Sequence, residues 1–179
     1  MDIAAHFLSE ARRILRRQKD LGDRAMAQLE EADLLRSLDR DSNSVAIIVK
    51  HIAGNMRSRW TDFLSTDGEK PDRRRDQEFV LDLGTTREQV LQWWEAGWSC
   101  LFQALDALQP EDLGRTVFIR SEEHSVMQAI QRQIDHYGHH VGQIVLLAKH
   151  WKGPQWKTLS IPRGESEAVN ARMRGGSGR

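Results

Sequence analysis

The fold is decided by residues 134–147, Ile134-Asp135-His136-Tyr137-Gly138-His139-His140-Val141-Gly142-Gln143-Ile144-Val145-Leu146-Leu147. This stretch holds three of the seven histidines within five consecutive positions, among aliphatic residues and without a proline. Apolar side chains that recur every three or four residues predict a helix with one buried face. We therefore expect the rest of the chain to pack around this helix.

The spacing of the histidines predicts which of them lie on one face of the helix. An α-helix turns by about 100° per residue, so side chains four residues apart are neighbours on its surface. His136 and His140 then lie together at the edge of the apolar stripe, whereas His139 lies nearly opposite and faces solvent. Gly138 and Gly142 weaken a helix, which predicts close packing of a neighbouring element against both.

Two helical histidines four apart indicate a metal site. Neutral imidazole is the commonest protein ligand for transition metals, and such a pair can bind one ion. His51 is the candidate third ligand, because it lies beside Ile48 and Ile52 on another predicted helix. Histidines that only form hydrogen bonds in a core are the alternative. The His-Glu-x-x-His pattern of zinc proteases does not occur here, which disfavours that class.

The remaining periodicity predicts an all-α fold, a four-helix bundle with one long crossover between the second and third helices. The helices are expected at about residues 3–35, 45–63, 86–108 and 126–150. The polar connection at residues 65–84 is long enough to run back along a helix, so the helices on either side of it are expected to be parallel.

Short motifs predict where some elements begin and which residues they bury. Capping boxes open the last two helices, with Thr85 and Glu88 in one and Ser125 and Gln128 in the other. Residues 115–120 are β-branched and predict a small strand or an extended link. The third helix is expected to bury a stripe made of Val90, Trp93, Gly97, Leu101, Ala104 and Leu108, with Trp94 and Trp98 beside it.

Composition bounds the class of protein. With 179 residues the chain predicts one domain at residues 1–165, followed by a flexible C-terminal tail at 166–179. The 26 basic and 26 acidic residues cancel, which argues against a nucleic-acid partner. We expect no membrane span and no signal peptide. The single cysteine, Cys100, fits a reducing cytoplasm, and a buried inert thiol is favoured over a nucleophile.

One further motif, the triplet Arg73-Arg74-Arg75, lies in the long connection. A run of charges in a loop is usually solvated, and that is the preferred interpretation here. Contact with an anionic ligand is the alternative.

On these residues the sequence resembles the DinB/YfiT-like superfamily of four-helix metalloproteins. The resemblance is carried by His136-x-x-x-His140-x-Gly142-Gln143 and by the upstream His51, and it covers about residues 3–162. Residues 49–63 resemble a bacterial branch that carries only an uncharacterised-domain label. The resemblance implies an up-down-down-up bundle, often a homodimer, with a divalent metal, zinc or nickel, on His51, His136 and His140.

The preferred hypothesis is a metal-dependent transferase or hydrolase acting on a small molecule. Three protein ligands would leave an open position, where a thiol or water has a lowered pKa. Some relatives transfer a low-molecular-weight thiol, which the resemblance implies as a co-substrate here. The alternatives are a non-catalytic metal- or ligand-binding bundle of a stress response, and a structural dimer with hydrogen-bonded histidines.

Five neighbouring residues are expected to support the site, and none is assigned a catalytic role. Gln143 and Asn55 are expected to orient a metal ligand or to bind substrate. Tyr137, Trp60 and Arg59 are expected to line the pocket, and packing in the core is the alternative for all three.

Overall fold

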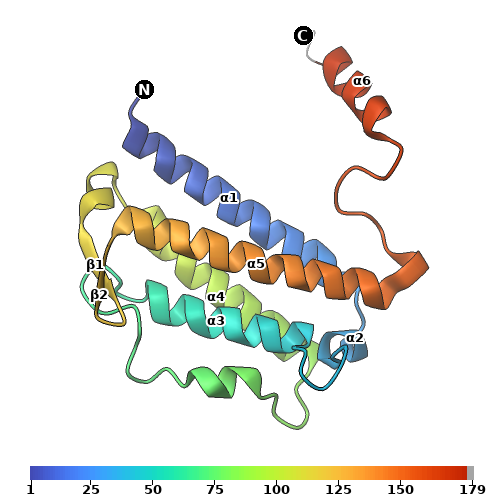
Figure 1. Cartoon of the computed structure of the whole chain (residues 1–179), viewed down its shortest axis with the longest axis horizontal. Coiled ribbons are helices and arrows are strands. Elements are labelled where there is room, and N and C mark those ends of the chain that lie inside the picture. The colour runs from blue at the N-terminus through green and yellow to red at the C-terminus, as the bar shows by residue number, and fades with distance from the viewer. Residues whose placement is uncertain (177–179) are drawn as a thin grey trace.

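A computed structural model describes residues 1–176 and is mostly helical (Figure 1). The bundle consists of the four long helices α1 (Ile3–Met26), α3 (Val45–Trp60), α4 (Arg87–Ala107) and α5 (Val126–Lys152). The shorter elements are α2 (Glu31–Leu35), α6 (Ser166–Gly176), the 3-10 helices η1 (Arg75–Phe79), η2 (Pro110–Gly114) and η3 (Gly153–Gln155), and the strands β1 (Thr116–Ile119) and β2 (Glu122–Ser125).

The second and third long helices run parallel. Near the start of both, Lys50 Nζ of α3 lies 5.3 Å from the centroid of the Trp93 ring of α4. Further along both, Cys100 Sγ of α4 is 3.9 Å from the carbonyl oxygen of Met56. The contacts therefore advance in the same direction on both helices. The long crossover allows the parallel pairing, because it connects the end of α3 to the start of α4 at the opposite end of the bundle.

The first long helix runs against the third. Arg12, in the first half of α1, donates to the carbonyl of Leu105 at the end of α4, at 2.7 Å. Trp94, near the start of α4, donates to Asp23 near the end of α1. In Figure 1 α1 and α5 run side by side in one direction, and α3 and α4 run in the other. The predicted bundle, with its crossover and its up-down-down-up order, is confirmed.

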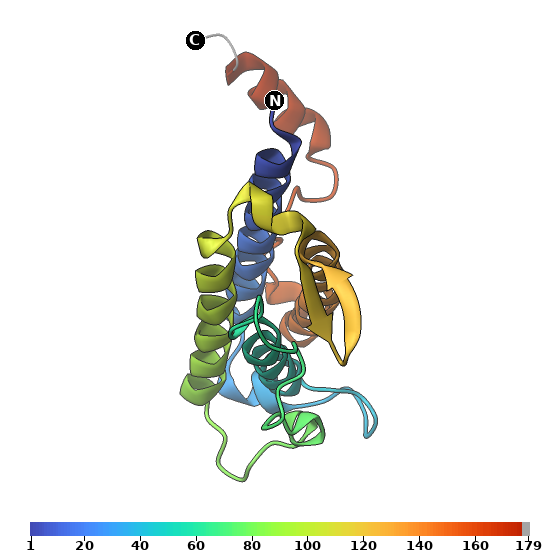
Figure 2. The same ribbon diagram turned by 90° about the vertical axis from the view of Figure 1, so that its left-hand side faces the viewer.

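The crossover packs along α3 and carries η1, as the view in Figure 2 shows. Lys50 Nζ donates to the carbonyl of Val80 at 2.6 Å, and Ser58 Oγ donates to the carbonyl of Gly68 at 2.8 Å. Both bonds join the outer face of α3 to the crossover, so this connection is held at two ends and is not a free loop.

The buried face of α4 is rotated by about one position from the predicted stripe. Trp94, Trp98 and Leu105 are buried, whereas Trp93 and Ala104 are half-buried. The helix packs against both α1 and α3, so its buried face points between them. Trp94 lies over Gly22 of α1, where an added Cβ would come within 2.5 Å of the indole. That glycine makes room for a tryptophan within a helix that continues from Ile3 to Met26.

Other predicted boundaries need correction. The first helix ends at Met26, and a capping box at Glu30 starts the separate helix α2, so residues 3–35 are not one helix. The N-cap of α4 is Thr86, whose side chain accepts from the Gln89 backbone; Thr85 instead donates to the carbonyl of Asp82. The capping box at Ser125 is confirmed.

The β-branched segment forms β1, and β2 pairs with it in an antiparallel hairpin that the sequence analysis missed. Residues 166–176 of the predicted tail form α6, an exposed helix, and residues 177–179 lie outside the described part of the chain. Within residues 1–176, no helix combines the length and the apolar character needed to cross a bilayer.

Two helical glycines differ in what surrounds them. A Cβ on Gly97 would lie 2.9 Å from Ala53 Cα, so the backbones of α3 and α4 approach each other closely at this point. A Cβ on Gly138 would meet the Gln18 side chain at 3.0 Å. Within the described residues nothing lies within 4 Å of a Cβ on Gly142, so the close packing predicted there is wrong.

We expect Gly142→Ala to raise the free energy of unfolding by about 0.5–1 kcal/mol, because alanine favours the helix and meets open space. Gly97→Ala should lower it by about 1–3 kcal/mol, because the methyl group forces two backbones apart. Urea unfolding of both metal-free variants measures the difference. Equal effects of the two substitutions would contradict this account of the α3–α4 contact.

Candidate metal centre

Three histidines meet between α3 and α5. One potential ligand nitrogen from each of His51, His136 and His140 lies within 4.8 Å of the others. The ring centroids are 5.6 Å apart for His51 and His136, 5.1 Å for His51 and His140, and 4.7 Å for His136 and His140. His139 is exposed, as its position on the helix predicts. The structure thus brings together the three residues that the sequence analysis selected.

A buried carboxylate fixes the His51 ring. The Nδ1 atom of His51 is 2.8 Å from Glu78 Oε2, and both side chains are less than a tenth exposed. Burial alone would raise the pKa of Glu78, but the hydrogen bonds from His51 and Arg73 outweigh it and hold this pKa below its usual value. An ionised carboxylate only accepts hydrogen bonds, so Nδ1 is the donor, and in the neutral imidazole Nε2 carries the free lone pair.

The Glu78 carboxylate has a second buried partner. Arg73 Nε donates to Glu78 Oε1 at 2.8 Å, and Arg73 Nη2 donates to Oε2 at 2.9 Å. This bidentate pair has little freedom to rotate. Gly54 allows the carboxylate to approach α3, since an added Cβ would lie 2.4 Å from Oε1.

The other two histidines have different environments. His140 Nδ1 is 2.8 Å from Gln143 Oε1, an acceptor, which leaves Nε2 as the free nitrogen. His136 Nδ1 is buried and has no hydrogen-bond partner within the described residues. An unpaired buried polar atom of this kind costs roughly 1–3 kcal/mol, so this nitrogen calls for a partner such as a cation.

Burial favours the neutral form of two of the three imidazoles. It lowers the pKa of His136 to about 3, and positive charge on His140 or His51 would oppose protonation further. Burial also lowers the pKa of His140. Neutral imidazole is the form that binds a metal, so the donor set fits a transition-metal ion. Bond lengths of about 2.0–2.1 Å would then draw the three nitrogens closer together.

A buried hydrogen-bonded chain lies beside the histidines. Trp60 Nε1 donates to Tyr137 OH at 3.0 Å, and Tyr137 OH donates to Asn55 Oδ1 at 3.0 Å. Trp60 and Tyr137 are buried in the core. These hydrogen bonds therefore tie α3 to α5 next to the histidines. Of the three residues, Asn55 also lines a polar cavity beside the histidines.

A polar cavity of about 450 Å³ opens beside the histidines. His51, His136, Asn55 and Arg59 line it together with four further arginines, Arg73, Arg75, Arg120 and Arg132, and with Gln133, Asp135 and His139. It gives a small molecule access to two of the three imidazoles, and it places Arg59 at the wall, where the sequence analysis expected it.

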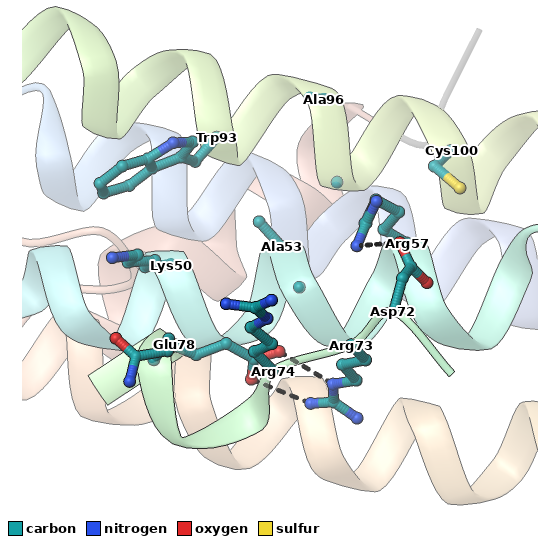
Figure 3. Close-up of a pocket in the computed structure, with 13 residues that line it drawn as sticks. Lys50, Ala53, Arg57, Asp72, Arg73, Arg74, Glu78, Trp93, Ala96 and Cys100 are labelled. Atoms are coloured by element: carbon teal, nitrogen blue, oxygen red, sulfur yellow. Dashed lines mark hydrogen bonds and ion pairs between the residues drawn. The ribbon is translucent and has the colours of Figure 1, made fainter. Parts of the chain in front are cut away.

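A second cavity, of about 480 Å³, lies on the other side of the Arg73–Glu78 pair (Figure 3). It runs between α3, α4 and the crossover, with Trp93 and Lys50 near one end and Cys100 near the other. Cys100 is half-buried, and its Sγ is 3.7 Å from Thr61 Oγ1. The Arg73–Glu78 pair is thus a wall between two cavities.

Several residues of the site escaped sequence analysis. Glu78 and Arg73 lie in the crossover, where no periodicity distinguishes them from the other charged residues. The one local signal is Phe79, an aromatic residue in a polar segment, whose ring centroid is 4.8 Å from that of His51. Gln133 is one turn before His136 on α5 and is buried, a position that the periodicity alone could have indicated.

Residues 2–165 match the family described as "Protein of unknown function (DUF1572)". The chain belongs to this family. No curated protein and no solved structure matches it. The match spans all three histidines of this DUF1572 chain, the Arg73–Glu78 pair and Gln143, but the family description names no activity. What the site does must therefore be argued from its geometry.

We expect Glu78→Ala to lower the free energy of unfolding of this DUF1572 chain by about 3–5 kcal/mol, because it removes the bidentate partner of the buried Arg73 and leaves only the longer contacts to Glu69. Asp72→Ala is the matched control in the same crossover. Asp72 pairs with Arg57 at 3.0 Å with both side chains more than half exposed, and such pairs contribute about 0–1 kcal/mol. Chemical denaturation measures both. Similar losses from the two variants would show that the buried pair is not structural.

Proposed function

We propose that this protein is a divalent-metal-dependent enzyme whose ion is held by His51, His136 and His140. The observation that carries the proposal is the convergence of three imidazoles beside an open polar cavity. Three protein ligands with a position left for water or substrate are typical of catalytic zinc sites, whereas structural sites are closed by four.

The side chains around the cluster support this role. Glu78 and Gln143 each engage the Nδ1 atom of one histidine, which orients the ring and leaves Nε2 for an ion. Asn55 and Arg59 line the cavity, where they would contact a bound substrate. A divalent ion bound there would supply Lewis acidity and lower the pKa of a thiol or a water molecule at the open position.

The resemblance to the DinB/YfiT-like superfamily favours one form of this chemistry. It supports zinc or nickel as the ion, and transfer of a low-molecular-weight thiol to a small electrophile as the reaction, with hydrolysis as the second form. It also supports a homodimer. The single cysteine favours a cytoplasmic location, and the balanced charge and the lack of an apolar span favour a small-molecule substrate over nucleic acid or a membrane.

One observation favours a second candidate, a non-catalytic metal- or ligand-binding bundle of a stress response. Asp135 is the one carboxylate that lines the cavity within the described residues, and no thiol lines it. A site with so few groups able to carry protons suits binding more readily than general acid–base catalysis.

Metal loading tests the site that both functions share. We expect chelator-treated protein to bind one zinc or nickel ion per chain, and His51→Ala, His136→Ala and His140→Ala each to abolish it. His150 is exposed on α5, the helix that carries His136 and His140, so the His150→Ala variant should bind the ion as the wild type does. An ion present at 100 times its dissociation constant stabilises the fold by about 2.7 kcal/mol, roughly 5–10 °C in Tm.

Elemental analysis, calorimetric titration and thermal unfolding give these values. Turnover of an electrophile with a thiol, dependent on the ion, would support the enzyme; stoichiometric metal without turnover would support the binding bundle. Wild-type protein that binds no metal, or histidine variants that bind it normally, would refute both the enzyme and the binding bundle.

The orientation of His140 can be tested separately. Gln143→Ala removes the acceptor for Nδ1, and we expect metal affinity to fall about tenfold. Gln143→Glu keeps an acceptor and should hold affinity near that of the wild type. Competition with a chromophoric chelator measures both, with Gln131→Ala, an exposed change on the same helix, as control. Equal affinities in all three variants would mean that Gln143 does not position the ring.

A further inference from the structure

The walls of the metal-site cavity are rich in arginine. Five guanidinium groups line it, from Arg59 on α3, Arg73 and Arg75 on the crossover, Arg120 in the hairpin turn and Arg132 on α5. The chain as a whole has no net charge, so this concentration is local. Because arginine does not lose its proton in proteins, these five groups stay positive at any ordinary pH.

Acidic neighbours balance part of this charge. Glu69 Oε2 lies 3.1 Å from Arg59 Nη2, 3.4 Å from Arg73 Nη1 and 3.0 Å from Arg120 Nε. Glu78 takes the remaining donors of Arg73. Asp135 is the carboxylate that lines the cavity itself, whereas Glu69 and Glu78 bind the arginines from behind the wall.

The two guanidinium groups without a close carboxylate lie on different elements. Arg132 has no ionic or hydrogen-bonding partner within residues 1–176. Arg75 has one distant ion pair, 3.9 Å from the almost fully exposed Asp76. Its guanidinium lies 5.0 Å from the Phe79 ring, which in turn packs on His51. Arg75 is thereby held near the histidines with its donors available.

Unpaired polar atoms also gather at this cavity. The described residues contain six buried side-chain nitrogen or oxygen atoms without a partner, and three belong to side chains that line it: Arg59 Nε, Gln133 Oε1 and His136 Nδ1. Arg59 and Gln133 are each more than nine-tenths buried. His136 Nδ1 belongs to the metal centre, and Gln133 Oε1 can only accept a hydrogen bond. Arg59 Nε is the donor among the three, and because native proteins satisfy most such atoms, it indicates a bound acceptor.

The turn that carries Arg120 is held in an uncommon conformation. Arg120 and Ser121 both have positive φ, 56° and 63°. The Asp67 carboxylate accepts from both backbone N–H groups, at 2.9 and 2.7 Å. Non-glycine residues pay for this geometry with strain, which tends to persist at functional sites. From this turn Arg120 Nε donates to Glu69 Oε2 at 3.0 Å.

We propose that this cavity binds a small molecule with at least two negative charges, carried by carboxylate or phosphate groups, and that Arg75 and Arg132 are its principal anchors. Guanidinium forks match the geometry of both groups. This inference rests on the proposed function, because it names the class of substrate for that same site. The anionic end lies on the arginines, and the rest of the molecule extends toward His51 and His136.

Calorimetric titration of the metal-free full-length chain tests the proposal without any contribution from a metal–anion bond. The probes are succinate, inorganic phosphate and the neutral succinamide. We expect succinate or phosphate to bind and succinamide not to, and the stronger of the two anions identifies the charged group. Binding of succinamide as strong as that of succinate, or no binding of either anion, would overturn the proposal.

Substitutions locate the anchors. Arg75→Gln and Arg132→Gln should each weaken anion binding about tenfold, and together about a hundredfold. Arg17→Gln, an exposed arginine on α1, is the matched control and should change nothing. Wild-type affinity in the double variant, or an equal loss in the control, would refute the assignment. The succinamide comparison needs no variant, so it decides the question even where a variant does not fold.

Zinc titration of the same preparations keeps the two proposals apart. Anion binding without zinc binding would end the metal-dependent function and leave the anion site standing. Zinc binding without anion binding would end this inference alone.

Discussion

The hydrogen bond between His51 and Glu78 is the contact on which the candidate site depends. It selects the tautomer of His51, and it lets one carboxylate join α3 to the crossover. Arg73 completes the arrangement by neutralising the carboxylate from the crossover side. A buried charge of this kind is tolerated only when it is paired, so the three residues form one unit. The glycine at position 54 belongs to that unit, because any larger residue would displace the carboxylate.

The same pair divides the space around α3 into two different environments. On one side the cavity beside the histidines is lined by five arginines, and on the other the cavity next to Trp93 and Cys100 combines charged residues with Ala53, Ala96 and the Trp93 ring. The arginine triplet is split accordingly, with Arg75 at the first cavity, Arg74 at the second and Arg73 between them. Three consecutive identical residues thus have three different surroundings, which a count of charges along the sequence does not show.

Helical periodicity was enough to place the histidines. His136 and His140 share a face for reasons internal to one helix, and His51 follows from the apolar stripe of another. The length of the crossover gave the parallel pairing. Periodicity does not distinguish Thr85 from Thr86 as the cap, because either side chain can accept the bond. The rotation of α4 depends on where Trp94 finds a partner on α1, and Glu78 is selected by a contact across 27 positions of the chain. The rotation of α4 and the partner of His51 are therefore set by contacts between distant segments, which periodicity does not contain.

The parallel pairing of α1 with α5 has a consequence for how the chain is made. The apolar face of α1, which ends at Met26, is covered in part by a helix that starts at Val126. Ribosomes add about 5–20 residues per second, so roughly 5–20 s separate the emergence of these two segments. During that interval the apolar face of α1 is exposed. Chaperones bind such faces, and neighbouring nascent chains can associate with them. Translation speed therefore bears on the yield of this protein in a way that its folded stability does not reveal.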